Sequence, residues 1–206
     1  MTFSFQHPVS VQEIGESLAN FSLDRESVLF ALSRLPDEHS INKVAIEYEI
    51  QLLKILSVGW AISYFMEDHL GKSSLIQKFW DVLFEFSKNL SSVTSLTIGK
   101  EVDYFRALKE RIDIYLKALA EVPHVRDPAS VIGPTFARLC GNTDNIHVIM
   151  AGNRIFHLSL EGVKHFLESV FSDATDASTH SAYPANDMAP WSAEDVLRSP
   201  AFLTPS

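Results

Sequence analysis

The sequence has little of the chemistry that marks secreted, metal-binding or phosphate-binding proteins. One cysteine among 206 residues excludes an internal disulfide and a thiolate metal cluster. Its eight glycines are scattered singly, and the motifs G-x-x-x-x-G-K-S/T, G-x-G-x-x-G, G-x-S-x-G and H-E-x-x-H are missing. These absences argue against the common hydrolase, kinase and dinucleotide-binding families. We therefore expect no catalytic residues, cofactor or metal ligands.

Basic residues and long apolar runs are also scarce. The 17 Lys and Arg are outnumbered by 26 Asp and Glu, which gives a net charge of −9 and argues against nucleic acid or anionic membranes as partners. The longest apolar stretch, 55–66, covers only about a dozen residues, whereas a membrane span needs about 20. Residues 1–8 lack the basic and apolar regions of a signal peptide. We expect a cytoplasmic protein with no membrane contact.

What is present is helical periodicity, which predicts an all-α protein. Asn42 is a suitable N-cap and Gly71 a suitable terminator for a helix over about 43–70. Its second half is apolar all round, which predicts burial on every side. Two amphipathic helices follow at about 73–89, with Phe86 and Leu90 on the inward face, and at about 100–121. The predicted architecture is a multi-helix bundle around the central helix 43–70.

Shorter helices are expected on both sides of these three. Before them lie 11–20 and 24–35; after them, prolines and Gly133 break the pattern until a helix at 135–140. Residues 146–158 flank Gly152 and Asn153, a pair suited to a two-residue turn. We favour a short helix that ends at Gly152 and then restarts, with a small β-hairpin as the alternative. A last amphipathic helix covers about 160–171.

The central helix also carries a polar stripe in its first half. Lys43, Glu47, Gln51 and Lys54 recur at helical spacing. They lie opposite an apolar face formed by Val44, Tyr48, Leu52 and Ile55.

The composition changes to Ser, Ala, Thr, Asp and Pro after residue 172. We divide the chain into a helical domain, 1–172, and an acidic, flexible tail, 173–206. Within the tail, Ser192 and Asp195 form a capping-box variant, so a short docking helix is predicted at 192–198. The residues expected to dock on this protein or on a partner are Trp191, Val196, Leu197, Phe202 and Leu203.

The leading functional hypothesis is a non-enzymatic protein–protein interaction or adaptor module that binds a protein partner or a second copy of itself. One alternative is a small-ligand site within the aromatic-rich bundle core, although aromatic residues at helical spacing usually fill cores. Another is a helix-turn-helix regulator over residues 11–35, although the net charge of residues 1–42 opposes phosphate binding.

Two further groups of residues are weaker candidates for a catalytic or metal site. Cys140 lies near Asp144 and His147 in sequence, a set from which a nucleophile and its base are sometimes built. A cysteine before a helix-ending glycine is more often a small buried group. Glu161, His165 and Glu168 share one helix face, but that face is the one opposite the apolar side. We predict no metal site there.

Overall fold

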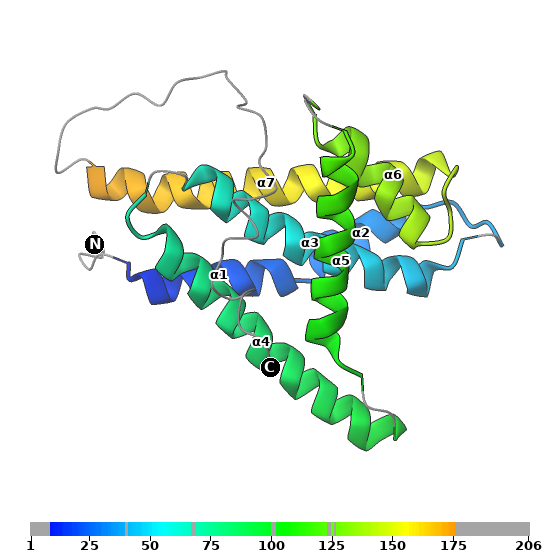
Figure 1. Cartoon of the computed structure of the whole chain (residues 1–206), viewed down its shortest axis with the longest axis horizontal. Helices are drawn as coiled ribbons and strands as arrows, with labels where there is room; N and C mark the ends of the chain where they lie inside the picture. The colour runs from blue at the N-terminus through cyan, green and yellow to red at the C-terminus, as the bar shows by residue number, and fades with distance from the viewer. Residues whose placement is uncertain are drawn as a thin grey trace, which may run out of the picture.

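The computed structural model describes residues 9–39, 41–66, 69–99, 102–122, 125 and 127–175, and all regular structure in these ranges is helical (Figure 1). The predicted all-α bundle is therefore confirmed. The helices are α1 (Val11–Leu23), α2 (Glu26–Ser33), α3 (Lys43–Phe65), α4 (Lys72–Ile98), α5 (Tyr104–Ala120), α6 (Ala129–Leu139) and α7 (Ile146–Thr175).

Helix α3 is the centre of the bundle. It packs against all six of the other described helices, and Figure 1 shows it between α7 and α1. Its residues are buried without interruption from Leu52 to Ser63, and over the second half of the helix the all-round apolar sequence predicts this burial. Across the described helices, no stretch combines the length and hydropathy needed to cross a bilayer. The helix begins after the Asn42 cap and ends at Phe65, earlier than predicted.

Both faces of the first half of α3 make contacts within the bundle. On the predicted apolar face, Leu52 and Ile55 are buried, and on the polar stripe three members bond to neighbouring segments. Glu47 pairs with Arg25, and Gln51 and Lys54 bond backbone carbonyls next to α2. On the opposite side Val44 is 79% exposed. The end of α1 and the residues after it hold these side chains, since they supply two backbone carbonyl groups and the Arg25 guanidinium.

Helices α4 and α5 form a projection from the bundle. Helix α4 continues to Ile98, well past the predicted end near residue 89, and stops at Gly99 with a positive φ of 67°. In Figure 1 its C-terminal half runs away from the other helices, and α5 returns from that far end.

Residues 146–158 lie inside the continuous helix α7, so the predicted helix is confirmed, whereas its predicted end at Gly152 and the β-hairpin alternative are wrong. Gly152 does not turn the chain; it allows close packing of α6 on α7. A Cβ atom at Gly152 would lie 2.7 Å from Cδ1 of Phe136. Helix α6 also starts before the predicted 135 and continues through Pro134, because its apolar face is buried in the core.

The helix-packing role of Gly152 is testable. On an open helix surface, Gly→Ala stabilises by up to about 1 kcal/mol. At Gly152 the added methyl group meets the Phe136 ring, so we expect Gly152→Ala to lower the free energy of unfolding by about 1–3 kcal/mol. Urea denaturation measures the change, with Ser169→Ala on the exposed side of α7 as the control. A Gly152→Ala chain at least as stable as the original would contradict this packing.

Candidate functional site

The residues predicted to dock, Trp191, Val196, Leu197, Phe202 and Leu203, lie outside the described residues, and so does the acidic segment around them. Docking through them stays a prediction. Helix α7 extends to Thr175, past the predicted domain boundary at residue 172, and the division into two parts also stays a prediction. The described residues offer two buried polar clusters and two exposed apolar surfaces.

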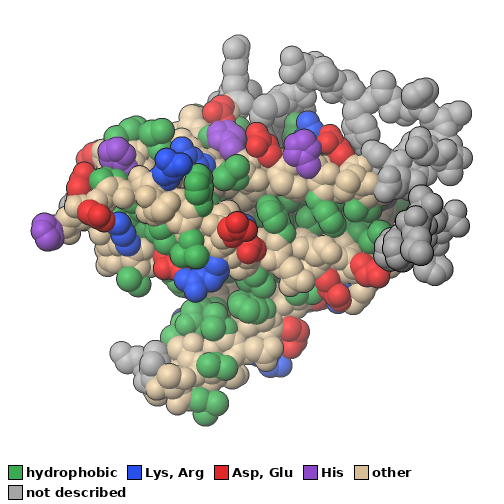
Figure 2. Space-filling model, turned by 180° about the vertical axis from the view of Figure 1, so that it is seen from behind, with side chains coloured by type: hydrophobic (Ala, Val, Ile, Leu, Met, Phe, Trp, Pro, Cys, Tyr) green, Lys and Arg blue, Asp and Glu red, His purple; other side chains and the backbone are tan. Residues whose placement is uncertain are grey.

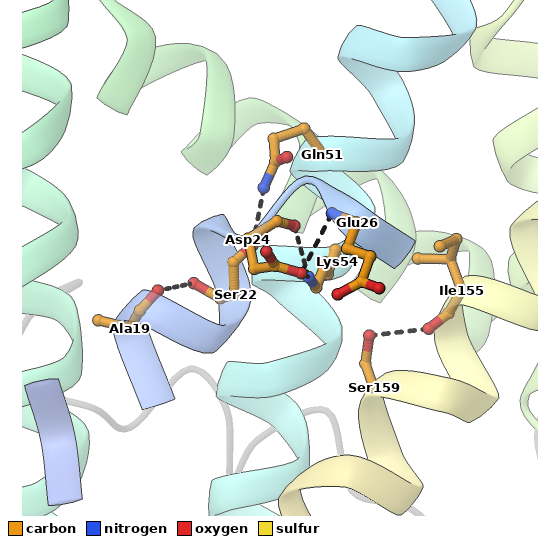
Figure 3. Close-up of polar contacts among 8 residues, drawn as sticks. All are labelled: Ala19, Ser22, Asp24, Glu26, Gln51, Lys54, Ile155 and Ser159. Carbon is orange, nitrogen blue, oxygen red and sulfur yellow. Dashed lines mark hydrogen bonds and ion pairs between the residues drawn. The ribbon is translucent and has the colours of Figure 1, made fainter. Parts of the chain in front are cut away.

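The first polar cluster is built around Lys54, which is only 1% exposed. Its Nζ donates a hydrogen bond of 2.7 Å to the backbone oxygen of Asp24 and lies 3.7 Å from the Asp24 carboxylate and 4.9 Å from the centre of the Phe21 ring. Gln51 donates a 2.7 Å bond to the backbone oxygen of Ser22. Figure 3 shows both side chains of α3 pointing at the end of α1.

This geometry gives Lys54 a structural role. The last carbonyls of a helix have no partner within it, and Gln51 and Lys54 supply donors where α1 ends. Burial lowers the pKa of the Lys54 amine, while the Asp24 carboxylate opposes the shift. A lysine with a lowered pKa is a candidate nucleophile or base. Here, however, the amine is bonded to the protein and covered, so no substrate reaches it.

The second polar cluster joins α3 to α5. The Arg111 guanidinium donates three hydrogen bonds, of 2.6, 2.8 and 3.1 Å, to the Glu49 carboxylate. Glu49 is buried, and its hydrogen bonds raise the pKa of Arg111. A buried carboxylate needs such a bidentate partner, because an unpaired buried charge is strongly destabilising.

Neither Tyr115 nor Cys140, the two potential nucleophiles near this pair, is ionised at neutral pH. Burial, reinforced by the Glu49 charge, raises the pKa of Cys140 to about 12. The same two causes hold the pKa of Tyr115 well above its usual value. The thiolate is the reactive form of cysteine, so Cys140 behaves as a buried apolar group and the nucleophile alternative is not supported.

The metal-site, ligand-pocket and helix-turn-helix alternatives find no support among the described residues. His165 Nδ1 lies 3.6 Å from a Glu168 oxygen at the surface, and within the described ranges no three His, Cys, Asp or Glu residues converge on a metal position. Several of the large aromatic side chains fill the core, because Trp60, Phe79, Trp80 and Tyr115 are buried. In the 11–35 segment, Arg25 is engaged by Glu47.

The most prominent exposed feature is an apolar stripe on the projecting half of α4. It consists of Phe86, Leu90, Val93 and Leu96, whose exposed fractions lie between 38% and 88%. Figure 2 shows this projection as the lower lobe, mostly hydrophobic and uncharged atoms. The interpretation that Phe86 and Leu90 point inward is wrong, because α5 contacts the neighbouring face of α4. Ser87 is buried there and Thr94 bonds the Tyr104 hydroxyl.

The polar side chains beside the stripe are already hydrogen-bonded within α4. Ser91 donates to the backbone oxygen of Ser87 at 2.8 Å, Ser92 to that of Lys88 at 3.0 Å, and Thr97 to that of Val93 at 2.8 Å. Covering the stripe therefore leaves these hydroxyl groups with partners, which removes much of the usual desolvation cost. This stripe is the candidate functional site.

The sequence holds a signal for the stripe that the periodicity argument missed. Between residues 86 and 99 the only charged residue is Lys88, and nothing breaks the helix before Gly99. A long helix with so little charge cannot have an ordinary solvated face. By contrast, the Glu49–Arg111 pair joins residues 62 positions apart and has no local signal.

Comparison with known proteins adds no further assignment. A scan against protein-family models, a search of curated proteins and a search of solved structures each found no match. The function is therefore argued from the surfaces of this chain alone.

The capping role of Lys54 predicts a large effect on stability. Replacing Lys54 with Ala creates a cavity and leaves the Asp24 carbonyl without its donor, so the free energy of unfolding should fall by about 2–4 kcal/mol. Lys54→Met keeps the apolar stem and should cost less. Guanidinium denaturation compares both with Lys164→Ala, which removes an exposed lysine of α7. An alanine variant within about 0.5 kcal/mol of the original chain would exclude this role.

The raised pKa of Cys140 predicts an unreactive thiol. A pKa of about 12 lowers the thiolate fraction at pH 8 by roughly a thousandfold relative to an ordinary cysteine. Labelling with DTNB at pH 8 should be at least about a hundredfold slower in the native protein than in the denatured chain. Equal rates in the two states would show that Cys140 is accessible and ionised.

Proposed function

We propose that this protein is a non-enzymatic protein-interaction module that self-associates through the α4 stripe. The observation that carries the proposal is the stripe itself, a row of exposed apolar side chains on a helix that projects from the bundle. Exposed apolar patches of this kind mark interaction sites on soluble proteins. A cytoplasmic location is also proposed, from the sequence alone.

The spacing of the stripe suits pairing with another helix. Phe86, Leu90 and Val93 follow one another at intervals of four and three residues, the repeat that packs knobs into holes between helices. Leu96 extends the row at the far end of α4. The partner surface is therefore best described as an apolar helix.

Charge favours a second copy of this chain as the partner. The protein carries a net charge of −9, so most of its surface repels an identical molecule. The α4 stripe is the exception, because Lys88 is the only charge between residues 86 and 99. A two-fold contact lays a surface against itself, and a nearly uncharged surface does so without repulsion. The projection also holds the acidic bundles apart.

The test is the mass of the full chain in solution. We expect a dimer at about 10 μM by sedimentation velocity, and a monomer after Leu90→Glu combined with Leu96→Glu. An unpaired charge buried in an apolar contact costs about 3–5 kcal/mol, so the double variant should raise the dissociation constant by at least about a hundredfold.

Leu70→Glu is the matched control, since Leu70 is a fully exposed leucine at the opposite end of α4. It should stay dimeric, and all variants should keep the helical circular-dichroism spectrum. An original chain that is monomeric at about 100 μM, a concentration at which even weak dimers form, overturns the proposal. So does a double variant that still dimerises.

A further inference from the structure

A second exposed surface lies where α2 packs against the N-terminal half of α7. We call it the arginine patch, and it consists of Leu29, Phe30, Arg34, Met150 and Arg154. The guanidinium carbon of Arg34 lies 5.0 Å from the centre of the Phe30 ring, and that of Arg154 lies 6.0 Å from it. Leu29, Phe30 and Met150 are each about half exposed. Figure 2 views this side, with basic atoms next to hydrophobic ones over α2 and the start of α7.

Arg34 and Arg154, like the exposed Arg138 of α6, differ from three other arginines of the chain. Arg25, Arg106 and Arg111 each pair with a glutamate. Among the residues that the structure describes, no carboxylate lies within ion-pair distance of Arg34 or Arg154. Two such guanidinium groups on one aromatic ring are unusual in a chain with 26 acidic residues and 17 basic ones. They fit a ligand that is both acidic and apolar.

One segment of this chain has that composition. Glu194 and Asp195 lie side by side in the sequence, between Trp191 and the pair Val196–Leu197, and Phe202–Leu203 follow. We infer that residues 191–203 bind the arginine patch of their own chain. Glu194 and Asp195 pair with Arg34 and Arg154, and the apolar side chains cover Phe30, Leu29 and Met150.

The chain is long enough for this contact. From Arg154 to Thr175, helix α7 rises about 32 Å at 1.5 Å per residue. The roughly 15 residues between Thr175 and Trp191 span up to about 50 Å when extended. The tail therefore reaches back along α7 with length to spare.

Attachment to the same chain favours this occupant over a free partner. A short tether gives the docking segment an effective concentration near the millimolar range, so modest contacts suffice. The arginine patch and the α4 stripe share no residue. Docking of the tail is therefore independent of the proposed self-association, and each is tested without the other.

The experiment measures how strongly acrylamide quenches Trp191 in the full chain. The Trp191 signal is the difference between each chain and its Trp191→Phe counterpart, because Trp60 and Trp80 are buried and contribute little quenching. We expect Trp191 to be protected several-fold relative to the denatured chain. The pair Arg34→Glu and Arg154→Glu should abolish the protection, and so should Glu194→Arg with Asp195→Arg. Combining all four substitutions should restore it, since the charges then match again.

The matched control is Arg106→Glu with Lys117→Glu, which makes the same charge change on the exposed side of α5 and should leave the protection intact. Protection should also be the same at nanomolar and micromolar protein. Three results overturn the inference. The first is that Trp191 is quenched as strongly in the native chain as in the denatured chain. The second is that neither charge reversal changes the protection of Trp191. The third is that the protection disappears when the protein is diluted.

Discussion

The second half of helix α3 has apolar side chains all round its axis, and the other helices must together remove them from water. Burial of apolar surface is the main favourable term in folding, and from Leu52 to Ser63 every residue of α3 is buried. A helix buried on every side needs neighbours on every side. That requirement explains why α3 contacts each of the other described helices and why α7 runs for 30 residues along the bundle.

Placing α3 at the centre creates a problem for its polar residues. Glu49 and Lys54 are carried into the core, where an unpaired charge is very costly. The bidentate contact with Arg111 and the bond to the Asp24 carbonyl solve it, and they also fix α5 and the end of α1 on α3. Considered alone, each of these two clusters resembles a catalytic site. Their burial, their bonding and the raised pKa of Cys140 make them structural.

The candidate functional features of this chain are therefore on its exposed surface. The bundle leaves uncovered a nearly uncharged stripe on α4 and a basic, apolar patch formed by α2 and α7. The two differ in chemistry, so we expect them to favour different partners. An uncharged stripe suits an identical surface, whereas bare guanidinium groups beside Phe30 suit an acidic segment.

The sequence alone determined the helical class, the central position of α3 and the Asn42 cap, because periodicity and capping depend on residues within one or two turns of each other. The sequence also contains the scarcity of charged residues that marks the α4 stripe, although the periodicity analysis missed it. Only the tertiary structure decided which face of α3 meets α1, that Gly152 packs against Phe136 in place of turning the chain, and that Glu49 finds Arg111 and Phe30 finds Arg154. Each of these depends on contacts between residues distant in the chain. Local patterns do not encode such contacts, because the partner is fixed only when the helices pack.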